Sequence, residues 1–132
     1  MKTTLRFDGG SRTGSKRSGC GAVLYDEKGN ELASACKRLE YGTNNVAEYE
    51  GLILGLELAL DKGIDHLCIE GDSMLVIQQM NGRWKINYPH LRTLHRKAME
   101  LYRRIPHGGG FVHIYRTKNE RADALANQAM DS

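Results

Sequence analysis

The order of its predicted elements constrains the fold of this chain more than any other sequence feature. Three strand patterns come first: residues 3–8 alternate in polarity, and residues 20–39 read as two strands joined by a short turn at "EKGN". Helix and strand patterns then alternate along the rest of the chain. Strands in succession followed by this alternation predict an α/β fold, in which helices pack on a mixed sheet.

The later elements follow from apolar spacing and from their flanking residues. A cap-competent asparagine, helix formers and a closing glycine predict a helix over 44–63. Helices are also expected at 73–80, 88–106 and 119–130, with strands at 66–71 and 111–116. The glycine, serine and basic residues of 10–19 predict a flexible connection.

Length and composition favour a single soluble domain. A chain of 132 residues is large enough for one hydrophobic core, so we expect one domain over residues 1–132. Its three cysteines are widely scattered among apolar neighbours, which predicts buried thiols in a reducing compartment. No apolar run approaches the ~20 residues that span a bilayer. We expect a cytoplasmic monomer that makes no contact with a membrane.

The basic side chains are unevenly distributed. The net charge is only +3, yet seven lysines and arginines lie between Arg83 and His107 against one acid, Glu100. Trp84 lies within this segment. The pattern fits a solvated helix face, and it equally fits a surface that binds a polyanion.

One acidic residue has an unusual position on its helix. At about 100° per residue, Glu48 points to the same side as the small and apolar residues that should pack on the sheet. Those residues are Gly51, Leu52, Gly55, Leu56 and Ala59. A carboxylate on a packed face is costly unless something pairs with it, although a position in the second turn would also let it escape at the helix end.

Three further acids each have an ordinary explanation and a functional one. Asp8 precedes two glycines, as in a hairpin turn; Asp72 could cap a helix; and Asp123 suits the first turn of the last helix. All three nevertheless fall where a strand ends or the next helix begins, and such ends commonly meet at one edge of a sheet. Converging carboxylates repel unless cations neutralise them, and Mg²⁺ prefers oxygen ligands. Paired ions of this kind catalyse phosphodiester hydrolysis.

Four motifs in a fixed order resemble ribonuclease H type 1 over nearly the whole chain. They are "FDGGS", "TNNVAEYEGLILGLELAL", "IEGDSMLV" and "NERADALANQAM". The resemblance implies a ribonuclease H-like fold with five strands in the order 3-2-1-4-5. It also implies an endoribonuclease that cuts the RNA strand of RNA-DNA hybrids, uses Mg²⁺ or Mn²⁺, and leaves 3'-hydroxyl and 5'-phosphate ends.

The resemblance assigns roles to individual residues. Asp8, Glu48, Asp72 and Asp123 match the catalytic, metal-binding acids. Asp8 would contact both ions, Asp123 the ion that activates water, and the other two acids the ion beside the leaving group. The implied substrate contacts are Gly9, Gly10, Ser11, Asn44 and Asn45, with Thr43 at a DNA phosphate and Trp84 and Lys85 in the basic segment. The 2'-hydroxyl would distinguish RNA from DNA.

The sequence also departs from the family pattern. Gly14 stands where a substrate-contacting asparagine is expected, which would pass that contact to Lys16 or Arg17, and Met74 replaces a glutamine. A separate basic protrusion helix and a loop histidine are both missing. Neither remaining candidate histidine is assigned a catalytic role, because His113 lies inside a predicted strand and His107 precedes its glycines.

Several readings of the chain stay open. Trp84 either stacks on substrate or packs at a helix junction. The protein could also be a catalytically weak module that binds hybrid or double-stranded RNA, or another nuclease on the same fold. The four acids argue against the weak module, and the "TNNVAE" segment argues against a different nuclease.

Overall fold

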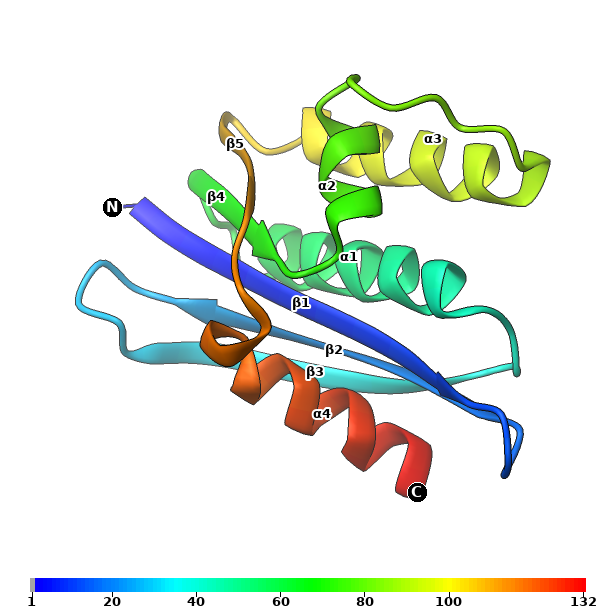
Figure 1. The fold of residues 1–132 in the computed structure, drawn as a ribbon. Coiled ribbons are helices and arrows are strands. Elements are labelled where there is room, and N and C mark those ends of the chain that lie inside the picture. Colours follow the sequence, from blue (N-terminus) through cyan, green and yellow to red (C-terminus); the bar gives the residue numbers. More distant parts are fainter. Residues whose placement is uncertain (1) are drawn as a thin grey trace.

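A five-stranded mixed sheet forms the centre of the molecule in the computed structural model, which describes residues 2–132. The strands are β1 (Lys2–Arg12), β2 (Arg17–Tyr25), β3 (Glu31–Leu39), β4 (His66–Gly71) and β5 (His107–His113). Their order in the sheet is β3-β2-β1-β4-β5 (Figure 1). β1, β2 and β3 pair antiparallel, whereas β4 pairs parallel with both β1 and β5. The predicted class and strand order are both confirmed.

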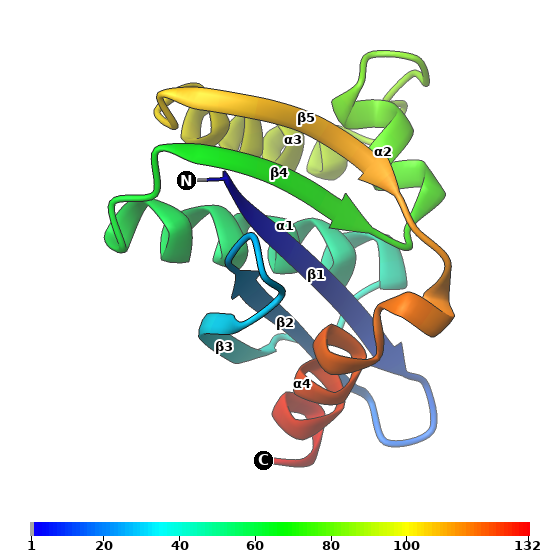
Figure 2. The same ribbon diagram turned by 90° about the vertical axis from the view of Figure 1, so that its left-hand side faces the viewer.

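Helices cover both faces of the sheet. They are α1 (Asn44–Asp61), α2 (Met74–Met80), α3 (Pro89–Arg103) and α4 (Glu120–Asp131), and a short 3-10 turn, η1 (Arg116–Lys118), precedes α4. Figure 2 shows α1 on one face and α4 on the other, with α2 and α3 on the side of α1. The fold therefore has three layers.

The alternating direction of the side chains along β2 explains why helices cover both faces of the sheet. Ala22 and Leu24 belong to the main core beneath α1, whereas Val23, between them, packs with Ala122 and Leu125 of α4. Successive side chains of a strand point to opposite faces, so an apolar run such as this one must be buried on both sides.

The first two strands are longer than the sequence predicts. The segment 10–19 is not a flexible connection, because the β1–β2 ladder continues from Gly10 opposite Gly19 to Arg12 opposite Arg17. Only residues 13–16 form the turn. The hairpin interpretation of Asp8 and its two glycines is therefore wrong: these residues lie inside β1.

Two smaller expectations also change. β5 starts at His107 and ends at His113, so it begins earlier and ends earlier than the predicted 111–116. Cys20 is buried as expected, but Cys36 and Cys68 are partly exposed, and all three thiols are free. Within residues 2–132, no helix is both long and apolar enough to cross a membrane.

Candidate active site

Two of the four acids meet where the parallel ladder between β1 and β4 stops. The last pair in that ladder is Phe7 opposite Gly71, so Asp8 and Asp72 are the next residues on the two neighbouring strands. β1 itself continues beyond Asp8 by pairing with β2 alone. The backbone register therefore places both carboxylates at one edge, as expected for residues that follow parallel strands.

Helix α1 lies directly against β1 at this point, and glycines make the approach possible. A Cβ on Gly51 would overlap the carbonyl oxygen of Asp8, and a Cβ on Gly9 would overlap the backbone of Ala47. Gly9 is thus required by helix packing, a reason that the sequence does not reveal. The close contact brings Glu48 next to Asp8.

Glu48 is buried on the packed face of α1, with only 6% of its surface exposed. Its carboxylate therefore does not reach solvent at the end of the helix. Its Oε1 accepts a hydrogen bond of 2.5 Å from the Gly9 N–H. Its Oε2 is buried and has no hydrogen-bond partner among residues 2–132. Because an unpartnered buried oxygen is costly, this atom is explained best by a ligand that the carboxylate binds.

The carboxylates of Asp8, Glu48 and Asp72 form one cluster, with an oxygen of each within 4.8 Å of the others. Burial is the main cause that raises the pKa of Asp8 from 3.8 to about 6, and the charge of Asp72 adds to it. Burial likewise raises the pKa of Glu48 well above its usual value, with further contributions from Asp8 and Asp72. Such a cluster holds protons to unusually high pH unless a cation replaces them.

Asp72 does not cap α2, contrary to its ordinary interpretation. The N-cap is Ser73, whose hydroxyl accepts a hydrogen bond of 3.2 Å from the Val76 N–H. Asp72 is instead positioned by Asn119, whose buried side-chain amide donates to Asp72 Oδ2 at 3.2 Å and to the Phe7 carbonyl at 2.9 Å. One amide therefore ties β1, the end of β4 and the start of α4 together.

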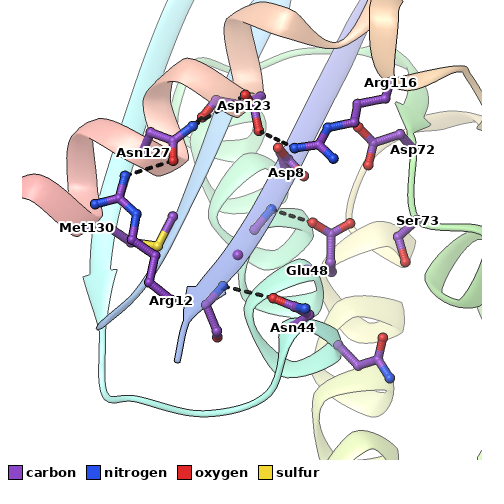
Figure 3. A pocket seen from close by; sticks show the side chains of 14 residues that line it. Asp8, Arg12, Asn44, Glu48, Asp72, Ser73, Arg116, Asp123, Asn127 and Met130 are labelled. Carbon is purple, nitrogen blue, oxygen red and sulfur yellow. Dashed lines mark hydrogen bonds and ion pairs between the residues drawn. The ribbon is translucent and has the colours of Figure 1, made fainter. Parts of the chain in front are cut away.

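Asp123 lies in the first turn of α4 and lines the same cavity as the other three acids (Figure 3). Its Oδ2 accepts a hydrogen bond of 3.3 Å from the side-chain amide of Asn127. Its Oδ1 lies 3.8 Å from the Arg116 guanidinium. Asp123 is not part of the tight carboxylate cluster, and it approaches from the opposite face of the sheet to Glu48.

The cavity has a volume of about 560 Å³. Of the predicted substrate contacts, five line it: Gly9, Gly10, Ser11, Asn44 and Asn45. Asn44 also accepts a hydrogen bond of 2.9 Å from the Ser11 N–H, which fixes the start of α1 against β1.

The other predicted contacts lie outside the cavity. Thr43 is the N-cap of α1, because its hydroxyl accepts a hydrogen bond of 3.2 Å from the Val46 N–H. Trp84 and Lys85 lie in the segment between α2 and α3, where Trp84 is 47% exposed. Lys16 is in the exposed β1–β2 turn. The proposed nucleic-acid contacts of these residues stay predictions.

Four cavity or support residues were missed by sequence reasoning: Arg12, Arg116, Asn119 and Asn127. Asn127 is four residues after Asp123 on the same helix, a spacing that puts the two side chains on one face and could have revealed it. Arg12 donates to Asn127 Oδ1 at 2.9 Å across a long sequence separation, which no local pattern encodes. Asn119 looks like an ordinary N-cap until its two distant partners are seen.

The donor set suits a hard divalent cation. Carboxylate oxygens converge from β1, from α1 and from the end of β4, and one of them has no other partner. The cations nearby are Arg12 and Arg116, which lie among the residues that line the cavity. Oxygen ligands of this kind match Mg²⁺ or Mn²⁺ better than zinc or copper.

Comparison with known proteins agrees with this fold. A family described as reverse transcriptase-like matches residues 6–129. Ribonuclease HI of Halobacterium salinarum is 42% identical over 125 residues, which cover 95% of this chain and 62% of that protein. The bifunctional protein Rv2228c of Mycobacterium tuberculosis is 40% identical over an alignment that covers 100% of this chain and 36% of that protein. The chain thus spans less than two thirds of the length of these relatives.

Solved structures give the same result. The crystal structure of RNase H1 from Halobacterium salinarum superimposes with a TM-score of 0.93 at 39% identity, covering 99% of this chain and 98% of that one. LC11-RNase H1, solved in complex with an RNA/DNA hybrid, gives a TM-score of 0.90 at 39% identity, with coverages of 98% and 97%. These superpositions show that the fold is shared along nearly the whole chain. This chain belongs to the ribonuclease H type 1 family.

Proposed function

We propose that this protein is an endoribonuclease that hydrolyses the RNA strand of RNA-DNA hybrids and leaves 3'-hydroxyl and 5'-phosphate ends. The observation that carries this proposal is the convergence of Asp8, Glu48 and Asp72, two of them buried, with an unpartnered oxygen on Glu48. A relative solved with an RNA/DNA hybrid supports the substrate class.

The four acids would hold two divalent ions, Mg²⁺ or Mn²⁺. Asp8 would contact both, Asp123 the ion on its side of the cavity, and Glu48 and Asp72 the other. Bound ions would lower the pKa of the attacking water and stabilise the charge on the leaving oxygen. Asp123 comes from α4 and Glu48 from α1, so the ligands approach Asp8 from both faces of the sheet.

The chain's own residues position these ligands. The Gly9 N–H fixes one oxygen of Glu48, the Asn119 amide fixes one oxygen of Asp72, and Asn127 fixes one oxygen of Asp123. For Glu48 and Asp72 the second carboxylate oxygen stays available, whereas that of Asp123 lies 3.8 Å from the Arg116 guanidinium. Such fixed supporting contacts reduce the reorganisation that metal binding would otherwise need.

Substrate recognition is proposed at the rim formed by Gly10, Asn44 and Asn45, which line the cavity beside the acids. Side-chain amides can donate to and accept from the 2'-hydroxyls that mark an RNA strand. Thr43, Trp84 and Lys85 would extend the contact outside the cavity, on the DNA strand or along the backbone. All four acids come from one chain, so we propose that a monomer suffices for the site. We also propose a cytoplasmic location and a single domain over residues 1–132.

A panel of labelled substrates tests this function. RNA-DNA hybrid, double-stranded RNA, double-stranded DNA and single strands are each incubated with Mg²⁺, Mn²⁺ or EDTA, and products are sized on gels. We expect cleavage of the RNA strand of the hybrid, dependent on metal. Cleavage of DNA alone would contradict the proposal, and hybrid binding without cleavage in any metal would favour a binding module.

The Asp8→Asn variant tests whether hydrolysis depends on the carboxylate of Asp8. It keeps the size of the side chain and removes its charge, so hydrolysis should fall by at least about 10³-fold while the fold and hybrid binding persist. Asp61→Asn, an exposed acid at the end of the same helix that carries Glu48, is the control and should retain activity. Equal activity in the two variants would overturn the assignment of Asp8.

A further inference from the structure

A second group of metal-binding side chains lies at the opposite end of β4 from the acids. Asp65, His66 and His107 each offer one ligand atom, and these atoms lie within 4.8 Å of one another. All three side chains are exposed. At about 3.3 Å per residue along β4, His66 is about 20 Å from Asp72, so the two groups are separate sites.

The sheet itself brings the two histidines together. His66 and His107 are the first pair in the parallel ladder between β4 and β5. Their imidazole rings stack, with centroids 4.3 Å apart and planes 17° from parallel. The partner residues come from segments far apart in the chain, so only the strand register creates this pair.

The third residue is held beside them by the backbone. The His107 N–H donates a hydrogen bond of 2.9 Å to the Asp65 carbonyl, so the segment that carries Asp65 is fixed against the start of β5. The Asp65 carboxylate lies 3.4 Å from His66 Nε2. The ligand atoms of two imidazoles and a carboxylate therefore lie close together at an exposed site.

The spacing of these three ligand atoms suits a transition-metal ion such as Zn²⁺, which binds both imidazole and carboxylate ligands. With Zn–N bonds of about 2.0–2.1 Å, two imidazole nitrogens on a tetrahedral ion lie about 3.4 Å apart. The lone pairs of two nearly parallel rings do not converge, so the rings must tilt out of their stack to bind one ion. Ligand atoms already within 4.8 Å need only side-chain rotations for this, and exposed rings are free to make them. Imidazole ligands favour Zn²⁺, Ni²⁺ or Cu²⁺, whereas Mg²⁺ prefers oxygen alone.

We propose that Asp65, His66 and His107 form a binding site for a transition-metal ion of the Zn²⁺ class, with water completing the coordination. The bound ion joins the starts of β4 and β5. This site is independent of the proposed catalytic function and takes a different class of metal from the carboxylate cluster.

Imidazole ¹H–¹⁵N spectra of the full chain test the site directly during titration with Zn²⁺ in excess Mg²⁺. No residue that lines the carboxylate cavity is a histidine within residues 2–132, so Zn²⁺ at that cavity does not give the same signal. We expect the resonances of His66 and His107 to change together and to saturate at one Zn²⁺ per chain. His90, exposed on α3, should not respond.

Variants identify the ligands. His66→Ala and His107→Ala should each weaken Zn²⁺ binding by more than about tenfold, as measured by calorimetry in excess Mg²⁺. Loss of a residue that only supports a metal ligand costs at least about tenfold in affinity, and loss of the ligand itself should cost more. His90→Ala is the matched control and should bind as the wild type. In His66→Ala the response of His107 should also disappear at the same Zn²⁺ concentration.

Two results would overturn the site. One is an unchanged Zn²⁺ affinity in both His66→Ala and His107→Ala. The other is a titration in which the His66 and His107 resonances do not move at millimolar Zn²⁺. Retained hybrid cleavage in Mg²⁺ is expected for both variants, because neither residue lines the carboxylate cavity.

Discussion

Glu48 is the residue at which stability and function conflict most clearly. Its carboxylate is buried beside Asp8, accepts one backbone hydrogen bond, and leaves the second oxygen without a partner among residues 2–132. In the absence of metal such a group disfavours the folded state when it is ionised. In the proposed metal-bound state the same oxygen would be a ligand. On this proposal, the cost of burial is the consequence of placing a metal site inside a packed interface.

Glu48→Gln should separate these two effects. The amide oxygen can still accept from the Gly9 N–H, but the buried charge is gone. In EDTA at pH 8 we expect the variant to be more stable than the wild type by about 1–3 kcal/mol, while hydrolysis falls by at least about 100-fold. Urea unfolding with and without Mg²⁺ measures the first effect, and the hybrid assay measures the second.

Glu57→Gln is the matched control, because Glu57 is exposed on the same helix. Its stability should stay within about 0.5 kcal/mol of the wild type. If Glu48→Gln proved less stable than the wild type in EDTA, the buried charge would not be the main influence of this side chain on the free energy of unfolding.

At the scale of elements, the contact between α1 and β1 determines whether the acids meet. Gly51 lies against the backbone of Asp8, and Gly9 lies against the backbone of α1. Because neither residue has a side chain, the backbones of the helix and the strand can lie in direct contact. The same closeness that packs the core brings Glu48 to Asp8, so packing and site geometry depend on one interface.

Gly51→Ala should therefore damage stability and activity together. Its Cβ would overlap the Asp8 carbonyl oxygen, and backbone cannot move aside as a flexible side chain can. We expect a loss of about 1–3 kcal/mol, as for other overpacked cores, and reduced Mg²⁺ affinity, because α1 must shift away from β1. Thermal unfolding and calorimetric Mg²⁺ titration are the measurements.

Gly14→Ala makes the same chemical change where no atom lies within 4 Å of the new Cβ. This control should leave Mg²⁺ affinity unchanged. Equal Mg²⁺ affinity in Gly51→Ala and the control would show that the helix position does not limit the site.

For the whole molecule, the carboxylate cluster couples protonation, metal binding and stability. Burial raises the pKa of Asp8 to about 6 and raises the pKa of Glu48 as well. Between their ordinary values and these raised values, the folded protein binds more protons than the unfolded chain. Stability from this pair is therefore greatest at low pH and is lost as pH rises through the folded-state values.

The metal-free protein should consequently lose stability between pH 5 and pH 8. The shift of Asp8 alone, from 3.8 to about 6, corresponds to a total change on the order of 3 kcal/mol, of which on the order of 1 kcal/mol falls above pH 5; Glu48 adds to the loss. Mg²⁺ should oppose the loss, because it binds the ionised carboxylates of the folded state. Unfolding curves at stepped pH, in EDTA and in Mg²⁺, give the comparison.

The double variant Asp8→Asn with Glu48→Gln removes both titrating groups. Its stability should no longer fall over the same pH range, because burial lowers the pKa of His95, which favours the folded state as pH rises. Mg²⁺ should add little. Asp26, Glu31 and Asp131 have lowered pKa values, so their titration falls below this window. A wild-type protein whose metal-free stability rose from pH 5 to pH 8 would contradict the raised pKa values.

Much of the fold was predictable because local patterns persist in the final structure. The packed face of α1, the apolar stripe of α4 and the strand at 66–71 all follow from spacing that the sequence displays. The extent of β1 and β2 was not predictable, because glycines and serines read locally as a loop. Pairing between Gly10 and Gly19 overrides that local preference.

The sequence by itself determined the class of fold, the family and the acids of the candidate site. Residue type and order suffice for these three conclusions, because apolar periodicity and the order of motifs can be read directly along the sequence. Only the tertiary structure decided that Asp8 lies within a strand, that Ser73 rather than Asp72 caps α2, and that Asn119 supports Asp72. It alone paired His66 with His107. These facts depend on strand register and close packing between distant segments, which no local stretch of sequence specifies.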